Sequence, residues 1–334
     1  MEELYPFKFK SIYKEKIWGN QKLRSVLNKP IPADKKIGES WEISSVQGNL
    51  SVVSNGYLAG NNLQELIEVY MGDLVGEKIF KKFGEEFPLL IKFIDASDVL
   101  SIQVHADDDL AGKRHNASGK TEMWYVIEAD EGSKLISGFN QEMDKDTYLK
   151  HLKNNTLPEI LNSEKVKSGD VFFLPSGRVH AIGKGILLAE IQQTSDVTYR
   201  IFDWNRKGQD GKPRELHNDM AVDAIDFNHY DSYKTDYTLI PDNTSNLVQC
   251  NYFTTNLIKA DQVIEKDLIK IDSFVIYMCM DGAAEFTYNE KETIQLTKGE
   301  TILVPATVDH IQIAPSPKTK LLEVYTEIKE EGEQ

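Results

Sequence analysis

The sequence predicts a mainly β protein made of two jelly-roll barrels, with a few helices at their periphery. Short segments rich in Val, Ile, Phe and Tyr alternate with turn residues along most of the chain, as in barrels and sandwiches. One motif begins at Gly169 and occurs again at Gly299. Helical spacing of apolar residues is confined to a small part of the chain.

Two segments are expected to be helices. From residue 63 to 74, apolar residues recur at intervals of three and four, and Asn62 with Glu65 forms a capping box at the start. A second, more polar helix is expected through residues 144–161. The acidic run 107–109 is expected to be solvated surface.

The other regular elements are expected to be strands, because β-branched and aromatic residues dominate short segments that turn residues separate. In chain order these segments are 88–96, 100–106, 122–129, 134–139, 170–176, 186–193, 197–205, 253–260, 274–280, 283–288, 300–306 and 320–327.

An internal repeat favours two similar units. Residues 169–180 read GDVFFLPSGRVH and residues 299–310 read GETILVPATVDH, with Gly, acid, Pro and His in register. Gly with an acid fits a hairpin turn, and Pro fits the exit of the apolar strand. The first copy fits the second sequence motif of cupin barrels, so the chain resembles a bicupin. His310 has no potential ligands in the strands before it, so the second unit is expected to hold no metal.

The boundary between the two units is expected in the polar, turn-rich stretch 229–246. This division gives a catalytic, metal-binding domain over residues 1–235, with helical insertions. It leaves a degenerate cupin domain over residues 236–334.

The composition limits the partners of the protein. A formal net charge of −15 argues against a nucleic acid or an anionic membrane as partner, since either favours a basic face. A small anionic substrate is compatible with this net charge if Lys and Arg side chains are grouped at its binding site. The N-terminus has no apolar signal-peptide core, and no apolar run is long enough to span a bilayer, so a cytoplasmic protein is expected.

Four potential metal ligands lie in or beside the expected strands: Gln103, His105, Glu122 and His180. Residues two apart in a strand point to one face, so Gln103 and His105 can enter one cavity, as can Lys120 and Glu122. Two imidazoles, a carboxylate and an amide suit zinc, with one position left for water or substrate. Iron and manganese accept nearly the same ligands, so these residues alone leave the metal open.

Five separated motifs, in the right order, carry a specific family resemblance. From about Trp18 to Arg206, the chain resembles type I mannose-6-phosphate isomerases of the short bacterial form. The resemblance implies one Zn²⁺ per chain and the interconversion of mannose 6-phosphate and fructose 6-phosphate through an enediol. The motifs are IWGN (17–20), GESWEIS (38–44), LSIQVHADD (100–108), GKTEMWYVI (119–127) and LPSGRVHAIGKGILLAEIQQTSDVTYRIFDWNR (174–206).

The resemblance also implies roles for single residues. Its zinc ligands fall on His105, Glu122 and His180, with Gln103 as the fourth ligand of the longer relatives. Arg200 matches the arginine of the family's active site. Lys120 matches the family's lysine that lies two residues before the ligand glutamate. Lys92 and Ser101 match positions that the family associates with the substrate pocket and the phosphate.

The chain departs from the longer relatives at two places. Thr121 stands where they have proline, and the segment between Glu122 and His180 is too short for their inserted helical domain. Features of substrate gating in those relatives therefore cannot be transferred to this chain.

Aldose–ketose isomerisation needs a base near C1 and C2, an electrophile for both oxygens and a clamp on the phosphate. Arg200 suits stabilisation of the enediolate, because a guanidinium keeps its charge. The residues leave three candidates for the base: Lys120, Glu190 and a metal-bound hydroxide.

Two other functions fit parts of the sequence. A metal-bearing cupin that oxidises a small molecule with iron and oxygen would use similar ligands. A binding or regulatory relative would keep the fold without turnover. The full set of ligands together with Lys120 and Arg200 argues for an enzyme.

Overall fold

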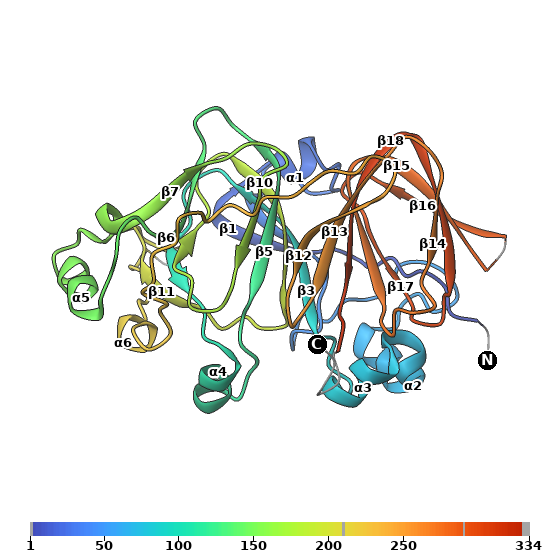
Figure 1. The fold of residues 1–334 in the computed structure, drawn as a ribbon, viewed down its shortest axis with the longest axis horizontal. Coiled ribbons are helices and arrows are strands. Elements are labelled where there is room, and N and C mark those ends of the chain that lie inside the picture. Colours follow the sequence, from blue (N-terminus) through green and yellow to red (C-terminus); the bar gives the residue numbers. More distant parts are fainter. Residues whose placement is uncertain (1–2, 209–210, 290, 329–334) are drawn as a thin grey trace.

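The computed structural model of the protein describes residues 3–208, 211–289 and 291–328. Over these residues the fold is mainly β, as predicted, and it consists of three antiparallel sheets (Figure 1). Two sheets belong to the first part of the chain, and the third takes its strands from residue 244 onward.

The first two sheets form the two layers that enclose the candidate site. In spatial order, the six-stranded sheet contains β1 (Ile12–Asn20), β2 (Ile37–Ile43), β3 (Leu89–Ala96), β10 (Ile186–Gln193), β5 (Glu122–Ala129) and β8 (Val171–Leu174). The five-stranded sheet contains β11 (Tyr199–Phe202), β4 (Ile102–Val104), β9 (His180–Ala181), β6 (Lys134–Phe139) and β7 (Leu161–Lys165).

The third sheet has seven strands. It contains β12 (Thr244–Gln249), β13 (Thr254–Ala260), β18 (His310–Tyr325), β15 (Val275–Tyr288) and β16 (Glu292–Thr297), with β14 (Ile264–Asp267) paired to β18 and β17 (Thr301–Val304) paired to β15. No sheet closes on itself within the described ranges, so the expected pair of barrels is not confirmed.

The expected strands 274–280 and 283–288 are one continuous strand, β15. Its pairing with β18 shifts register on both sides of Asp281, which marks a bulge. Gly282 has a φ of 74°, and a Cβ there would lie 1.9 Å from the carbonyl oxygen of Lys318. The Asp-Gly pair therefore bends the strand and does not end it.

Helices lie at the periphery of the sheets. They are α1 (Lys22–Ser25), α2 (Leu63–Val75), α3 (Glu77–Phe83), α4 (Asp108–His115), α5 (Lys145–Lys153) and α6 (Asn218–Ala221), with a 3₁₀ turn, η1 (Leu157–Ile160). The expected helix 144–161 is thus divided between α5 and η1.

The predicted capping box begins α2. Asn62 Oδ1 accepts a hydrogen bond from the Glu65 N–H at 3.0 Å, and Glu65 Oε2 accepts one from the Asn62 N–H at 2.8 Å. Met71 stands at one of the apolar positions in the expected helix 63–74, but it is 50% exposed and has a φ of 47°. The helix is kinked there, which turns this side chain away from the core.

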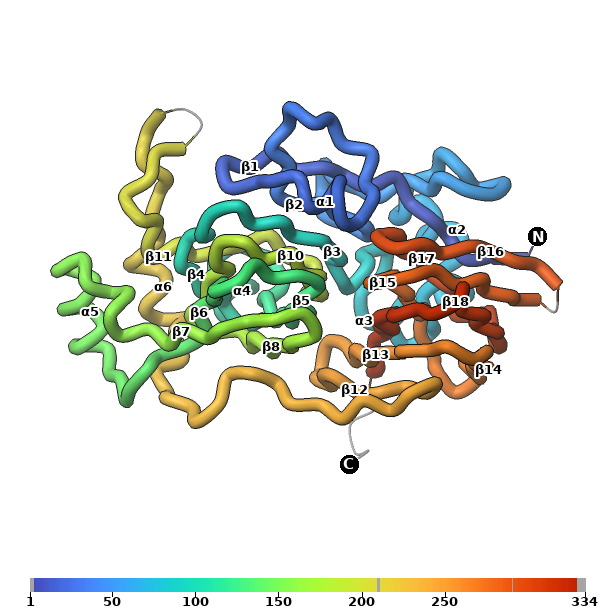
Figure 2. The backbone as a smooth tube through the Cα atoms, turned by 90° about the horizontal axis from the view of Figure 1, so that it is seen from above, coloured from blue at the N-terminus to red at the C-terminus, as the bar shows by residue number. Residues whose placement is uncertain are grey.

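The two ends of the chain meet in one apolar core. Figure 1 shows α2 and α3 beneath the strands of the third sheet. Phe7 exchanges backbone hydrogen bonds of 2.8 and 2.9 Å with Leu303 of β17. In Figure 2, the segment between α6 and β12 runs along one side of the first two sheets. These contacts cross the boundary expected near residue 235, which itself stays a prediction.

The two copies of the repeat have the same turn geometry. Gly169 and Gly299 have φ of 90° and 85°, a conformation that favours glycine. The following acids, Asp170 and Glu300, each accept a hydrogen bond from the backbone N–H three residues earlier, at 3.0 and 2.8 Å. The Gly-acid pair therefore closes a tight turn before each of the largely buried strands β8 and β17.

Candidate metal centre

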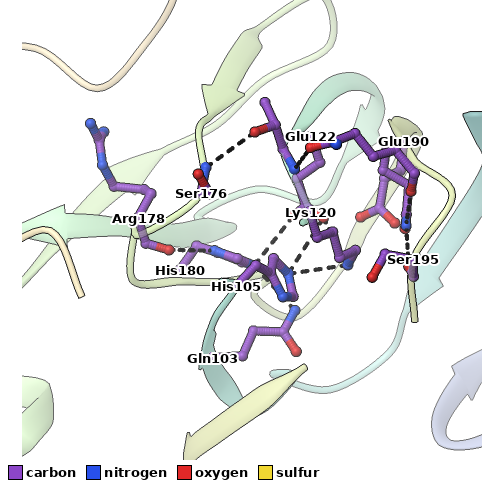
Figure 3. Close-up of polar contacts among 12 residues, drawn as sticks. Gln103, His105, Lys120, Glu122, Ser176, Arg178, His180, Glu190 and Ser195 are labelled. Carbon is purple, nitrogen blue, oxygen red and sulfur yellow. Dashed lines mark hydrogen bonds and ion pairs between the residues drawn. The ribbon is translucent and has the colours of Figure 1, made fainter. Parts of the chain in front are cut away.

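The potential ligands come from both layers of the first two sheets. Glu122 is the first residue of β5 in the six-stranded sheet. Gln103 of β4 and His180 of β9 are cross-strand partners in the five-stranded sheet, and His105 follows β4. Figure 3 shows these side chains converging, together with Lys120. The predicted ligands are therefore brought together.

The distances between the ligand atoms fit a small cation. Glu122 Oε1 lies 3.2 Å from His180 Nε2, and Glu122 Oε2 lies 3.5 Å from His105 Nε2. Atoms that bind zinc tetrahedrally at 2.0–2.1 Å are about 3.3 Å apart. Neither Glu122 oxygen nor His105 Nδ1 has a hydrogen-bond partner of good geometry in the described part of the chain, although Lys120 Nζ forms an ion pair with Glu122 Oε2 at 2.9 Å. Buried polar atoms without such partners are expected where an ion belongs.

Both imidazoles direct a lone pair at the same point. His180 Nδ1 donates to the carbonyl of Arg178 at 2.8 Å, because a carbonyl can only accept. His105 Nε2 accepts from Lys120 Nζ at 3.1 Å, because an ammonium can only donate. In each neutral ring the Nε2 atom is therefore the unprotonated one, and this atom faces Glu122.

The charge states also suit a metal. Burial lowers the pKa of His105 to about 3, helped by the positive charge of Lys120. Burial likewise lowers the pKa of His180. Burial alone would raise the pKa of Glu122, but Lys120 and the two histidines hold it well below its usual range. At neutral pH the group therefore presents two neutral imidazoles and one carboxylate.

Gln103 borders the same point. Its Nε2 lies 3.2 Å from His180 Nε2. The nitrogen and oxygen of an amide exchange places when χ3 turns by 180°. The Gln103 oxygen can thus reach the position that a fourth ligand needs.

Arg200 lies on β11 directly opposite Gln103, so both side chains share the face turned toward the site. One guanidinium nitrogen donates to the carbonyl of Glu215 at 2.9 Å, while Nε has no partner among the described residues. Burial and nearby Arg214 lower the pKa of Arg200. This half-buried cation thus has one buried donor, Nε, without a hydrogen-bond partner among the described residues.

Glu190 and Lys92 form a buried layer beside the ligands. Lys92 Nζ donates to Glu190 Oε1 at 2.9 Å and to Gln192 Oε1 at 2.5 Å. Trp124 Nε1 donates to Glu190 Oε2 at 2.8 Å, and the Trp124 ring stands edge-on to His180, with centroids 5.4 Å apart. Both Glu190 oxygens are thus engaged, and the network supports the ligand His180.

Ser101 is buried one residue before β4. Within the described ranges, no hydrogen bond joins it to the ligand group. The assignment of Ser101 to the pocket therefore stays a prediction.

Sequence reasoning did not identify two supporting residues. Trp124 could have been found, because it lies two residues after Glu122 and shares its face. Arg178 acts through its backbone carbonyl, which no sequence pattern reveals. Its guanidinium lies 4.5 Å from the ring centroid of Tyr230 and 4.7 Å from that of Tyr233, which fixes the turn.

The second copy of the repeat lacks this environment. His310 begins β18 and is exposed, whereas His180 is buried. Throughout the described part of the chain, one group of His, Cys, Asp or Glu side chains can hold a metal, and it is His105, Glu122 and His180. A helix of the length and apolarity required to cross a membrane is not found among the described residues.

Two family models match the sequence. The type I phosphomannose isomerase catalytic domain matches residues 6–136, and the mannose-6-phosphate isomerase cupin domain matches residues 243–325. A mannose-6-phosphate isomerase of Bacillus subtilis (strain 168) is 36% identical over 303 residues, covering 90% of this chain and 93% of that protein. The mannose-6-phosphate isomerase of Streptococcus mutans serotype c is 40% identical over 220 residues, covering 66% of this chain and 67% of that protein.

Solved structures of mannose-6-phosphate isomerases are also similar to this chain. The mannose 6-phosphate isomerase from Bacillus subtilis matches with a TM-score of 0.86 and 33% identity, over 97% of this chain and 100% of that chain. A protein from Archaeoglobus fulgidus described as a putative mannosephosphate isomerase shares the fold, with a TM-score of 0.79 and 20% identity over 98% of this chain and 100% of that chain.

Proposed function

The chain belongs to the type I phosphomannose isomerase family of enzymes, and we propose that it interconverts mannose 6-phosphate and fructose 6-phosphate with one bound Zn²⁺. The observation that carries the metal assignment is the buried group of His105, Glu122 and His180, with both Nε2 lone pairs facing the carboxylate. Neutral imidazoles with one carboxylate are a ligand set that zinc enzymes use. Gln103 is the proposed fourth ligand.

Bound zinc supplies Lewis acidity that polarises the sugar oxygens and eases loss of the C2 proton. The reaction from aldose to ketose moves one proton from C2 to C1 and another from O2 to O1. A negative charge develops on the oxygens of the enediolate between these transfers. The half-buried Arg200 is the cation proposed to stabilise that charge.

For the proton transfer between the carbons we favour Lys120, which would act as the base in its neutral amine form and return the proton to the neighbouring carbon. Its Nζ lies 2.9 Å from Glu122 Oε2 and 3.1 Å from His105 Nε2, beside the proposed zinc. Glu190 is less suited, because Lys92 and Trp124 occupy both its oxygens. We assign Glu190 to holding the site in place, and a metal-bound hydroxide remains the other candidate base.

Lys92 and Ser101 are the proposed contacts for the phosphate end of the substrate. Lys92 would have to exchange Glu190 and Gln192 for the phosphate, since both now accept from it. Substitution of either residue should raise KM more than it lowers kcat if this assignment holds.

We also propose that the sheets form two cupin-type units, residues 1–235 and 236–334. The cupin-domain match over residues 243–325 and the shared turn geometry at Gly169 and Gly299 support this division.

The purified protein tests the proposal directly. We expect about one zinc per chain, conversion of fructose 6-phosphate to mannose 6-phosphate, loss of turnover on chelation and recovery with zinc. Metal analysis and a coupled assay measure these quantities. Full occupancy by iron together with oxygen consumption on a sugar would instead identify an oxygenase.

A further inference from the structure

Asp108, in the acidic run at the start of α4, is bonded to three distant segments. Its Oδ1 accepts from the Gly119 N–H at 2.8 Å and from Gln193 Nε2 at 3.0 Å. Its Oδ2 accepts from the Tyr252 hydroxyl at 2.7 Å. The acidic run 107–109 is exposed, as expected, but Asp108 also accepts hydrogen bonds from three other segments.

These bonds hold the turn that carries Lys120. Three successive N–H groups are anchored there: Gly119 to Asp108 Oδ1, Lys120 to the Ala106 carbonyl at 3.0 Å, and Thr121 to Gln193 Oε1 at 2.8 Å. The first anchor is Asp108 itself, and the third is a side chain that Asp108 holds. Two of the three anchors thus depend on one carboxylate.

The packing at Gly119 shows how closely the turn approaches α4. A Cβ at Gly119 would lie 2.5 Å from the backbone nitrogen of Asp108, so only glycine fits. With its backbone fixed in this way, Lys120 extends its Nζ to 2.9 Å from Glu122 Oε2. Glu122 itself begins β5 two residues later.

We infer that Asp108 is a positioning residue, which holds the Gly119–Thr121 turn so that Lys120 and Glu122 meet at the reaction centre. The inference rests on the proposed function for the role of Lys120. It also gives the C-terminal part of the chain a link to catalysis, because Tyr252, just before β13, bonds the same carboxylate.

Asp108 can be altered without removing core packing. It lies on the wall of a cleft of about 820 Å³, whose lining also includes Gln193 and Tyr252. The neighbouring Asp107 provides a matched control. Its Oδ1 accepts from the Leu110 N–H at 2.8 Å, and among the described residues its side chain makes no hydrogen bond to the Gly119–Thr121 turn. Loss of Asp107 therefore weakens the helix and leaves the anchor of the turn in place.

The experiment compares the full-length, zinc-loaded proteins Asp108→Ala, Asp107→Ala and Asp108→Asn. We expect Asp108→Ala to lower kcat about 10- to 100-fold, as small misplacements of catalytic groups do, with unchanged zinc content. Asp107→Ala should stay within about threefold of wild type. Asp108→Asn keeps an acceptor for Gly119 and should recover much of the loss.

Amide hydrogen exchange provides a readout that does not depend on activity. Exchange at residues 119–121 should become at least about tenfold faster in Asp108→Ala than in wild type, because two anchors of this turn are lost. In Asp107→Ala the exchange at these residues should be unchanged.

Equal kcat in Asp108→Ala and Asp107→Ala, or unchanged exchange at 119–121 in Asp108→Ala, would overturn the inference. So would loss of zinc from Asp108→Ala, which would place its effect on the metal and not on Lys120. Absence of isomerase activity in the wild-type protein would refute the proposed function instead, and the exchange data would still decide whether Asp108 holds the turn.

Discussion

Single buried residues set the chemistry of the site through their hydrogen-bond partners. A backbone carbonyl fixes the tautomer of His180, and an ammonium fixes that of His105. Such partners matter because a buried imidazole can bind a metal only through an unprotonated nitrogen. Hydrogen-bond partners also distinguish Arg200 from Glu190. Arg200 Nε is buried without a partner among the described residues, whereas both oxygens of Glu190 accept hydrogen bonds.

We predict that Arg200→Ala lowers kcat by about 100-fold or more, which is the usual effect of removing one donor from a developing oxyanion. Zinc content should not change, because among the described residues no hydrogen bond or ion pair joins the Arg200 side chain to His105, Glu122 or His180. Steady-state kinetics and metal analysis of the purified variant measure both. Arg24→Ala, at an exposed position in α1, removes the same charge and should behave as wild type. A kcat within a few-fold of wild type in Arg200→Ala would exclude a catalytic role.

At the scale of elements, the Asp95 carboxylate of β3 links the six-stranded sheet to α1 through hydrogen bonds. Its Oδ2 accepts from the Lys22 N–H at 2.6 Å and the Leu23 N–H at 3.3 Å, while Oδ1 has no hydrogen-bond partner among the described residues. Burial raises the pKa of Asp95 from 3.8 to about 6. The folded state therefore carries a poorly solvated charge above that pH.

This shift predicts how pH changes stability. Below the unfolded pKa both states are protonated and Asp95 costs nothing. Between the unfolded pKa and the folded pKa, the unfolded chain has lost its proton while the folded chain still holds it. The free energy of unfolding therefore falls by on the order of 3 kcal/mol as pH rises through the folded pKa. Asp95→Asn stays neutral and keeps an acceptor for α1.

The free energy of unfolding of Asp95→Asn should therefore rise relative to wild type between pH 4 and pH 7. Urea denaturation of both proteins across this range measures the difference. A difference that does not vary with pH would contradict the burial of a charged Asp95.

The elements also show what the sequence could predict. The period of two along strands placed Gln103, His105 and Glu122 correctly, since each lies in or beside a regular strand. The bulge at Gly282 looked like a turn, because Asp-Gly favours both. The role of Asp108 was not predictable, because its partners lie 11, 85 and 144 residues away and only the tertiary fold brings them together.

At the scale of the whole molecule, the two copies of the repeat differ in their chemical surroundings. The Gly-acid turns at Gly169 and Gly299 are alike, and each apolar strand that follows is largely buried. His180 and His310 occupy matching positions of the repeat. Of these two histidines, His180 alone lies among the described residues beside a second sheet that supplies a carboxylate, so the candidate metal site depends on the two layers and not on the motif alone.

This asymmetry predicts different outcomes for one substitution made at the two repeat positions. His180→Ala should weaken zinc binding by more than 100-fold and abolish isomerisation, since losing even a group that supports a ligand costs about 10- to 100-fold. His310→Ala should keep zinc and turnover, and its exposed position should limit the stability change to about 0.5 kcal/mol. Metal analysis, assays and thermal unfolding of both variants compare them under the same conditions. Equal loss of zinc from the two would mean that the second unit also binds metal, because a single buried site cannot depend on an exposed histidine in the other unit.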